Sequence, residues 1–240
     1  MNKQKINYQK KLDKVLENLV AANGLKEHPE NKPSLLLHAC CGPCSSYCLE
    51  YLTDYFNITV LYYNPNIYPE KEYNRRFNEL KRLYKEFPPA INGNVKVVEL
   101  PYIPEDFYGA VKTREEPELA GEPEKGIRCS RCYELRLRAS FNYALKNKFD
   151  YFCTTLSISP FKDGDKINSI GAAIEQEAAD SGILKAPQWL VSDFKKKGGF
   201  KRSLELSDEY NMYRQEYCGC IYSFRSREEY EKSLKERNDN

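Results

Sequence analysis

The chain has 240 residues, of which 30% are charged and 41% hydrophobic, a composition typical of a globular protein. Its formal net charge of +2 excludes a strongly basic overall field, so a structured RNA would have to be held by a local basic patch. No run of about 18 apolar residues is present, so no membrane span is expected, and the N-terminus lacks the apolar core of a signal peptide, which predicts a cytoplasmic protein.

Residues 1–33 are predicted to form a helical extension at the N-terminus. Apolar residues recur there at helical spacing, and Asn23-Gly24 supplies a stop signal. These apolar positions are Leu12, Val15, Leu16, Leu19 and Val20. We expect this helix to pack on the rest of the protein rather than to bind a partner.

Residues 34–240 are predicted to form a single α/β domain with a helical C-terminal part. Short apolar strands at 34–39, 58–63, 95–100 and 150–155 alternate with helices at 44–55, 69–87, 129–146 and 165–181, and a further helix is expected around Met212 to Tyr217. This alternation implies a doubly wound, mostly parallel sheet. Ligands of such sheets bind at the carboxyl ends of the strands.

The nine cysteines are the most informative residues, because cytosolic cysteines more often serve as ligands or redox groups than as structural disulfides. Cys40 and Cys41 follow the first strand, with Cys44 just beyond them, and Cys129 and Cys132 form a C-x-x-C pair at the start of a helix. Both groups are expected at the same edge of the sheet. Cys48 and Cys153 fall inside a helix and a strand and are expected to be core residues.

Three kinds of site are compatible with four thiolates on two loops. Vicinal cysteines suit a [4Fe–4S] cluster, because each of them can take a different iron corner. Zinc usually prefers two C-x-x-C knuckles. A redox dithiol without metal is the third possibility.

A second pair, Cys218-Gly219-Cys220, lies close to the C-terminus. A disulfide across one residue would be strained and easily reduced, which suits an electron relay; the alternative is a pair of reduced, half-buried thiols. His38 precedes the first cysteines in a buried strand and is expected to be structural. The basic run Lys195 to Lys197 is either a solvated loop or a contact for RNA phosphates.

The joint pattern resembles one known family. His38-Ala-Cys-Cys-Gly-Pro-Cys44, Cys129-x-x-Cys132, Thr154-Thr-Leu-Ser-Ile-Ser-Pro160, Asp193-Phe-Lys-Lys-Lys-Gly-Gly199 and Tyr217-Cys-Gly-Cys220 together look like the non-cobalamin epoxyqueuosine reductases. The match runs from about Ser34 to Arg225 and leaves out the N-terminal helix.

This resemblance implies a fold, an activity and a set of site residues. The fold would be similar to that of the adenine-nucleotide α-hydrolases, and the activity would be reduction of the epoxide of epoxyqueuosine, at the wobble base of certain tRNAs, to the alkene of queuosine. The implied [4Fe–4S] ligands are Cys40, Cys41, Cys129 and Cys132, and Cys218 and Cys220 would form a redox-active disulfide. An additional iron is implied near the cluster, with Cys44 as a candidate ligand. The partners would be a tRNA carrying epoxyqueuosine and an electron donor that the sequence does not identify.

The chemistry of this reaction asks for further groups. Removing the epoxide oxygen as water needs two electrons and two protons, and Lys162, Asp163 and Asp165 are equal candidates for the proton donor. Tyr62, Tyr63 and Phe161 are candidates for stacking on the base.

Three rival functions use the same residues. An ATP-dependent tRNA-modifying enzyme on a related fold would need a Gly-rich phosphate loop where this chain has Cys40-Cys41-Gly42-Pro43. A zinc-binding module without enzymatic activity and a metal-free thiol–disulfide oxidoreductase are the other two.

Overall fold

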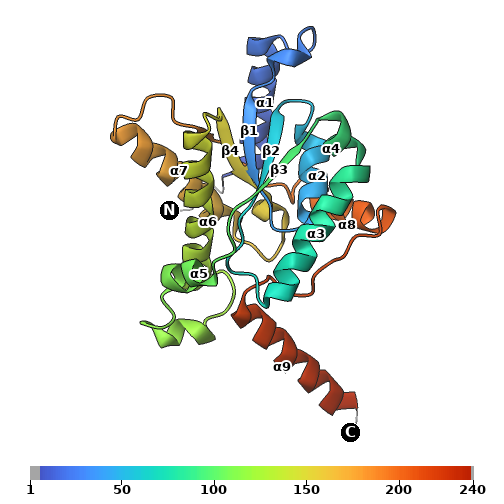
Figure 1. Cartoon of the computed structure of the whole chain (residues 1–240), viewed down its shortest axis with the longest axis vertical. Helices are drawn as coiled ribbons and strands as arrows, with labels where there is room; N and C mark the ends of the chain where they lie inside the picture. The colour runs from blue at the N-terminus through green and yellow to red at the C-terminus, as the bar shows by residue number, and fades with distance from the viewer. Residues whose placement is uncertain (1–5, 239–240) are drawn as a thin grey trace.

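A five-stranded parallel sheet with the order β3-β2-β1-β4-β5 lies at the centre of the computed structural model, which describes residues 6–238 (Figure 1). In the register of the sheet, Leu35 lies beside Ile58 on one side and beside Tyr151 on the other. The strands are β1 (Ser34–His38), β2 (Asn57–Tyr62), β3 (Lys96–Glu99), β4 (Tyr151–Thr154) and β5 (Gln188–Trp189).

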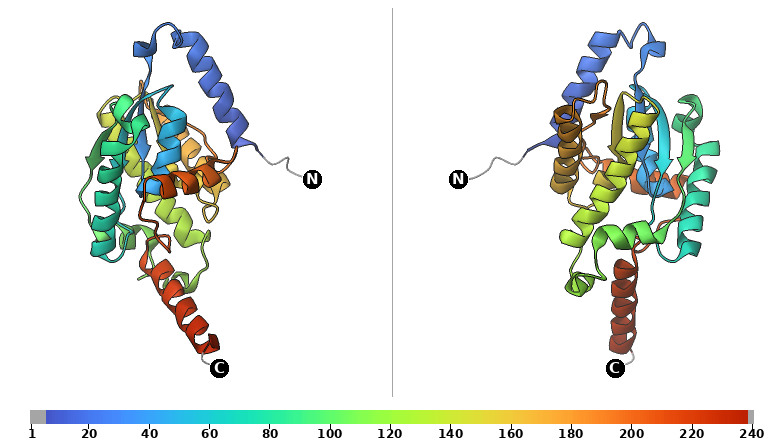
Figure 2. Two further views of the ribbon diagram at one scale, coloured as in Figure 1. Left: turned by 90° about the vertical axis from the view of Figure 1, so that its right-hand side faces the viewer. Right: turned by 60° about the vertical axis from the view of Figure 1, so that its left-hand side comes forward.

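Helices cover both faces of the sheet, which makes three layers (Figures 1 and 2). One face is covered by α1 (Tyr8–Asn23), α2 (Gly42–Leu52), α3 (Glu70–Glu86), α4 (Pro88–Asn92) and α8 (Gly199–Glu209). The other face is covered by α6 (Ile127–Lys146) and α7 (Gly164–Asp180), and α5 (Pro104–Val111) packs against α6. The last helix, α9 (Ile221–Asn238), projects away from the body (Figure 2). Short 3₁₀ turns occur at η1 (Pro29–Asn31), η2 (Pro117–Gly121) and η3 (Thr155–Ile158).

The apolar run of β1 explains how the layers are held together. Successive side chains of a strand point to opposite faces, so Leu35 and Leu37 enter the core beneath α1 to α4, while Leu36 enters the core beneath α6 and α7. All three side chains are fully buried. Burial of each one stabilises the fold by roughly 1.5–3 kcal/mol.

The strand order indicates where a ligand site is expected, between β1 and β4. The chain winds outward from β1 through β2 to β3, then crosses back to form β4 on the other side of β1. Open sheets of this kind bind ligands at this reversal point, beyond the carboxyl ends of the strands. Cys40 and Cys41 follow β1 there, and η3 follows β4.

The predicted α/β class and doubly wound parallel sheet are confirmed, with all four predicted strands present. The first helix is also found, ending at Gly24 in the left-handed conformation with φ +59°. Residues 1–5 of the predicted N-terminal extension lie outside the described residues. Among the residues described, no helix is long and apolar enough to cross a membrane.

The prediction of a helix around Met212 to Tyr217 is wrong. The helix in this part of the chain is α8, which ends at Glu209, and residues 212–217 have no helical structure. Asn211 has a φ of +44°, a left-handed conformation that ends helices. The two-residue strand β5 and helix α5 were not predicted.

Candidate functional site

The first group of thiols lies where β1 gives way to α2. Cys41 is the N-cap of α2, and Cys44 lies in the first turn of that helix. The Sγ atoms of Cys40, Cys41 and Cys44 all lie within 4.8 Å of one another. Cys40 and Cys41 are buried, whereas Cys44 is half-buried. Three sulfur atoms this close form a donor set that suits a soft metal or an iron–sulfur cluster.

The thiols of this group differ in how strongly they favour the charged form. Hydrogen bonding with Cys41 and Cys44 lowers the pKa of Cys40 well below its usual range, and hydrogen bonding with Cys40 raises the pKa of Cys41 to about 12. Positive charge from Arg136 favours the thiolate of Cys40, and that from Arg76 favours the thiolate of Cys41. Because metal binding requires thiolates, two buried guanidinium groups beside the sulfurs fit a thiolate-bound metal centre.

The second group of thiols surrounds the start of α6. Cys129 and Cys132 lie in its first two turns, and the charges of Cys218 and Cys220 act on both of them. Burial raises the pKa of Cys132 to about 12. Burial lowers the pKa of Arg136, but the negative charges of Cys132 and Cys218 in the second group and of Cys40 in the first group outweigh burial and raise it. Arg136 thereby links the two groups electrostatically.

The predicted four-cysteine ligand set is brought together only in part. Cys40 and Cys41 lie in the close group with Cys44, and Cys129 and Cys132 lie outside that group. Ligation of one cluster by all four therefore stays a prediction.

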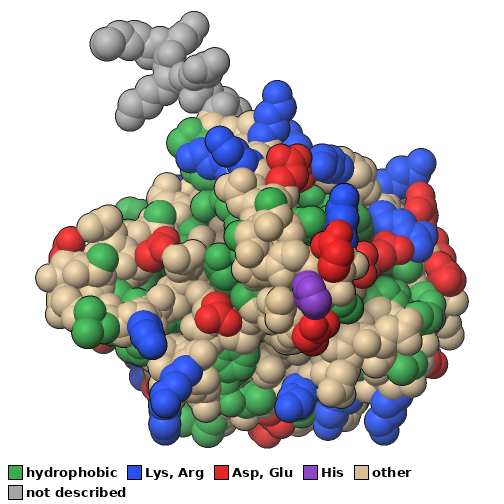
Figure 3. Space-filling view, turned by 90° about the horizontal axis from the view of Figure 1, so that it is seen from above, with side chains coloured by type: hydrophobic (Ala, Val, Ile, Leu, Met, Phe, Trp, Pro, Cys, Tyr) green, Lys and Arg blue, Asp and Glu red, His purple; other side chains and the backbone are tan. Residues whose placement is uncertain are grey.

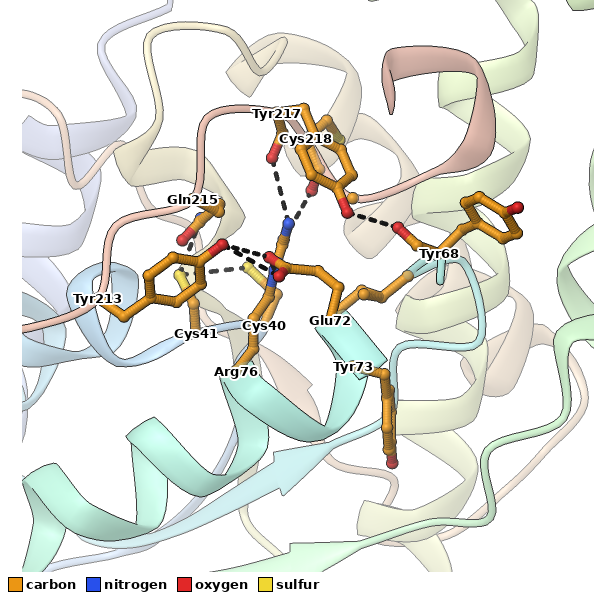
Figure 4. A network of polar contacts seen from close by, with 12 residues as sticks. Cys40, Cys41, Tyr68, Glu72, Tyr73, Arg76, Tyr213, Gln215, Tyr217 and Cys218 are labelled. Atoms are coloured by element: carbon orange, nitrogen blue, oxygen red, sulfur yellow. Dashed lines mark hydrogen bonds and ion pairs between the residues drawn. The ribbon is translucent and has the colours of Figure 1, made fainter. Parts of the chain in front are cut away.

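The loop Tyr217–Cys220 is held from below by a buried ion pair (Figure 4). The guanidinium of Arg76 donates to the carbonyl oxygens of Cys218 at 3.1 Å and of Tyr217 at 3.3 Å, and its Nε donates to Glu72 at 2.7 Å. The side chain of Arg76 has no exposed surface. Tyr213 donates its hydroxyl to Glu72 at 3.0 Å and completes the network.

Further contacts fix the same loop from both sides. The amide of Tyr68 donates to the carbonyl of Gly219 at 2.7 Å, and Gly219 adopts a φ of +133°, a conformation that favours glycine. Gln215 donates its amide to Cys41 Sγ at 3.3 Å, which ties the loop to the first group of thiols. The Tyr217–Cys220 loop is thereby positioned against the carboxyl end of β1.

The two thiols of the loop have different surroundings. The Nζ atom of Lys162 donates to the Sγ atom of Cys218. Cys220 instead packs with Phe107 and Cys132 in an apolar cluster and lies 3.5 Å from the hydroxyl of Ser223. Burial, followed by the charge of Cys218, raises the pKa of Cys220.

A cavity of about 720 Å³ opens beside both groups of thiols. Its wall combines the β1–α2 turn, η2 and the segment after it, the loop after β4, and the chain from Arg214 to the start of α9. Cys40, Cys44, Phe161, Lys162, Cys218 and Tyr222 are among the lining residues. The convergence of these loops at the carboxyl edge of the sheet agrees with the prediction from sequence.

Other predicted residues divide into structural and exposed ones. His38 is fully buried between Thr154 Oγ1 at 2.9 Å and the carbonyl of Tyr63 at 3.1 Å, as a structural histidine would be. The prediction that Tyr62 stacks on a base is wrong, because Tyr62 is fully buried and stacks on Phe77. Phe161, by contrast, is 67% exposed on the cavity wall.

The remaining predictions about cysteines and basic residues can also be placed. Cys48 and Cys153 are fully buried core residues, as predicted. In the basic run, Lys195 pairs with Asp193 at 2.6 Å, and Lys197 pairs with Asp13 at 2.8 Å.

Arg76 and Arg136 are functional residues that the sequence motifs do not include. A signal for them existed, since each lies on the apolar stripe of its helix: Arg76 stands between Tyr73 and Leu80, and Arg136 stands beside Leu137. An arginine on a buried helical stripe needs an acceptor or an anion nearby.

Comparison with known proteins places the chain among enzymes of one kind. The family model described as epoxyqueuosine reductase QueH matches residues 35–226. The chain is 40% identical over 223 residues to the epoxyqueuosine reductase QueH of Staphylococcus aureus, covering 93% of this chain and 86% of that protein. It is 37% identical over 223 residues to that of Staphylococcus epidermidis, with 93% and 87% covered, and 39% identical over 220 residues to that of Streptococcus pyogenes, with 92% and 79% covered.

Among solved structures, the U34-tRNA thiolase NcsA of Methanococcus maripaludis with its [4Fe-4S] cluster aligns with a TM-score of 0.43 at 13% identity, covering 91% of this chain and 73% of that chain. That likeness is too weak to support a conclusion about this site.

Proposed function

Because the chain belongs to the family of QueH epoxyqueuosine reductases, we propose that it reduces the epoxide of epoxyqueuosine in tRNA to the alkene of queuosine. The observation that carries this proposal is one cavity whose wall contains Cys40 and Cys44 from the first group of thiols together with Cys218. A metal-binding group and a redox-capable thiol thereby face the same space, in which a base could be bound.

We further propose that Cys40, Cys41, Cys129 and Cys132 hold a [4Fe–4S] cluster. The cluster would supply single-electron transfer and a positive centre for the epoxide oxygen. Cys44, the third sulfur of the close group, is the candidate ligand for an additional iron. Cys218 and Cys220 would cycle between a dithiol and a disulfide.

The cavity also offers groups suited to a nucleotide. Phe161 presents an exposed ring for stacking. The side chain of Arg225 is exposed on the same wall and makes no hydrogen bond or ion pair within residues 6–238, so its guanidinium is free to meet a phosphate. The opposite end of the molecule, seen in Figure 3, mixes Lys and Arg with Asp and Glu and offers no field of one sign to RNA. We therefore propose that the tRNA binds at the cavity. Because the proposed substrate is a tRNA, we also propose that the enzyme acts in the cytoplasm.

The rival functions are less well supported by this site. The turn between β1 and α2 carries thiols and a proline instead of the Gly-rich loop that holds phosphates in an ATP-dependent enzyme. Zinc and iron–sulfur occupancy are distinguished by metal analysis: anaerobically purified protein should be brown and contain iron and acid-labile sulfide. Stoichiometric zinc without sulfide would contradict the cluster.

The activity is tested with tRNA that carries epoxyqueuosine. The tRNA is incubated anaerobically with the protein and a chemical reductant, digested to nucleosides, and analysed by mass spectrometry. We expect epoxyqueuosine to be replaced by queuosine, which lacks one oxygen atom. Unchanged epoxyqueuosine with protein that contains its full iron and sulfide would refute the proposal. Cys218→Ser is the matched negative variant, since it removes one redox thiol and none of the proposed cluster ligands.

A further inference from the structure

Lys162 is a buried cation at the end of the loop after β4. It is only 8% exposed, and the small exposed part faces the cavity. Its Nζ atom donates to the Sγ atom of Cys218, a residue of the Tyr217–Cys220 loop. Cys218 lines the cavity as well. A buried ammonium group needs an anion close by, and no carboxylate contacts this one among the hydrogen bonds and ion pairs of the described residues.

The three equal candidates for the proton donor are separated by their positions. Asp163 is the N-cap of α7 and accepts a hydrogen bond from the amide of Lys166 at 3.0 Å. Asp165 is exposed in the first turn of α7, and neither aspartate lines the cavity. Lys162 does line the cavity, and it is the one of the three that contacts a redox thiol.

We propose that Lys162 donates a proton to the epoxide oxygen as Cys218 is oxidised, so that one side chain couples electron loss from the thiol pair to protonation of the leaving oxygen. This inference rests on the proposed reductase function and deepens it. With its Nζ atom donating to Cys218 Sγ, Lys162 would hold this sulfur in the reduced enzyme as an ammonium–thiolate pair.

The step balances without an outside reductant in a single turnover. The Cys218 thiolate and the Cys220 thiol lose two electrons and form an S–S bond, while both C–O bonds of the epoxide break and the alkene forms. The Cys220 proton and one proton of the Lys162 ammonium leave with the oxygen as water. The products are the alkene, water, the disulfide and a neutral Lys162 amine. An electron donor then returns two electrons to the disulfide, and solvent restores the two protons.

The surroundings of Lys162 make its acidity depend on the oxidation state of Cys218. Burial by itself would lower the pKa of Lys162, but the negative charges of Cys218, Tyr133 and Glu124 outweigh burial and raise it. The charge of Cys218 makes the largest of these contributions. Lys162 also interacts electrostatically with Cys129. Once Cys218 becomes part of a disulfide, its charge is lost and burial acts against the ammonium. Oxidation of Cys218 therefore makes the Lys162 ammonium a stronger acid at the step in which the epoxide oxygen is protonated.

The ammonium–thiolate pair can be tested without turnover. Anaerobically reduced protein is pulsed with iodoacetamide, and fragment-ion mass spectrometry measures alkylation at Cys218 and Cys220 separately. Because the thiolate is the reactive form, Lys162→Met should slow alkylation of Cys218 by about 10-fold or more. Lys162→Arg keeps the positive charge and should remain within about 3-fold of wild type. Lys201→Met, which changes an exposed lysine on α8, is the matched control and should have no effect.

Proton donation is tested by single turnover of the pre-reduced protein. Arginine cannot give up its proton in a protein, so Lys162→Arg should keep reactive Cys218 yet lose activity by about 100-fold, the usual loss when a general acid is removed. Lys162→Met should lose both properties. The iron and sulfide content and the circular dichroism of each variant show that it is folded and loaded.

Two outcomes would overturn the inference. Equal alkylation rates at Cys218 in wild type and Lys162→Met would show that no ammonium–thiolate pair exists. Single turnover of Lys162→Arg at the wild-type rate would show that the proton comes from elsewhere. If wild-type protein itself leaves epoxyqueuosine unchanged, the proposed function fails instead, and the alkylation rates still decide whether the pair exists.

Discussion

Replacing Arg76 by methionine should destabilise the protein and loosen the Tyr217–Cys220 loop. Arg76 lies on α3 with no exposed side-chain surface, and it joins Glu72 to the carbonyl groups of Tyr217 and Cys218. Methionine fills much of the same volume, so the main effect comes from lost charge and hydrogen bonds rather than from a cavity. Three interactions are lost at once, and Glu72, with a side chain 9% exposed, keeps its charge without the cation.

The expected magnitude follows from what is left behind. Removing one partner of a buried ion pair costs about 3–5 kcal/mol, because the other charge stays buried. Glu72 retains the hydroxyl of Tyr213 at 3.0 Å, which places the expected cost at the lower end, about 3 kcal/mol. For a chain of this size, that loss corresponds to a fall in Tm of about 6–12 °C.

Urea unfolding of the reduced, cluster-free protein measures this change directly. Adding Glu72→Gln to Arg76→Met should recover part of the loss, about 1–2 kcal/mol, because the stranded charge is removed. Arg114→Met is the control, since Arg114 and Glu105 form an ion pair with both side chains more than half exposed, and exposed pairs contribute little. If Arg76→Met unfolds with the wild-type free energy, or if the effects in the double variant are strictly additive, then Arg76 and Glu72 do not stabilise the protein as a coupled pair.

Cys41→Ala should remove iron and sulfide together, whereas Cys153→Ala should retain both and cost about 1–2 kcal/mol as a core truncation. Cys220→Ser should retain iron and lose both single and multiple turnover, which activity assays would show; normal turnover would mean that the pair is structural. Phe161→Ala should weaken tRNA binding by about 5- to 100-fold if the ring stacks on a base; unchanged affinity in a filter-binding assay would remove that role. Gly171→Ala should cost about 1–3 kcal/mol on urea unfolding, because a Cβ atom would come within 2.2 Å of the Trp189 ring; no loss would contradict this packing.

The strands and helices that the sequence predicts are those with a clear repeat and a marked end. β1 is a short apolar run bounded by proline and glycine, and α1 ends at a glycine in the left-handed conformation. β5 contains only Gln188 and Trp189, too few residues to show any alternation. In the C-terminal part, the apolar and aromatic residues after Glu209 suggest a helix, but Asn211 turns the chain out of α8.

The site could be predicted as a set of thiols but not as an arrangement. The cysteines could be recognised because their spacing relative to the strands places them at one edge of the sheet. The backbone partners of Arg76 could not be predicted, since Tyr217 lies 141 residues away in the chain and supplies a carbonyl group that any residue would carry. Lys162 meets Cys218 across 56 residues, again through tertiary packing alone.

The two buried arginines show how an apolar sheet can carry a cluster of thiolates at its edge. Arg76 reaches the thiols from α3 on one face of the sheet, and Arg136 reaches them from α6 on the other. Replacing Arg76 and Glu72 together by well-packed apolar side chains would cost the fold little, because desolvation of both charges is expensive, whereas replacing the arginine alone strands the carboxylate. Arg76 has a partner in Glu72, whereas Arg136 has no carboxylate partner among the ion pairs of the described residues, and the negative charges that favour its guanidinium include those of Cys132, Cys218 and Cys40. Arg76 also favours the thiolate of Cys41, but its charge is balanced by Glu72, so Arg136 is the arginine of the two whose position calls for thiolate charge at the end of β1.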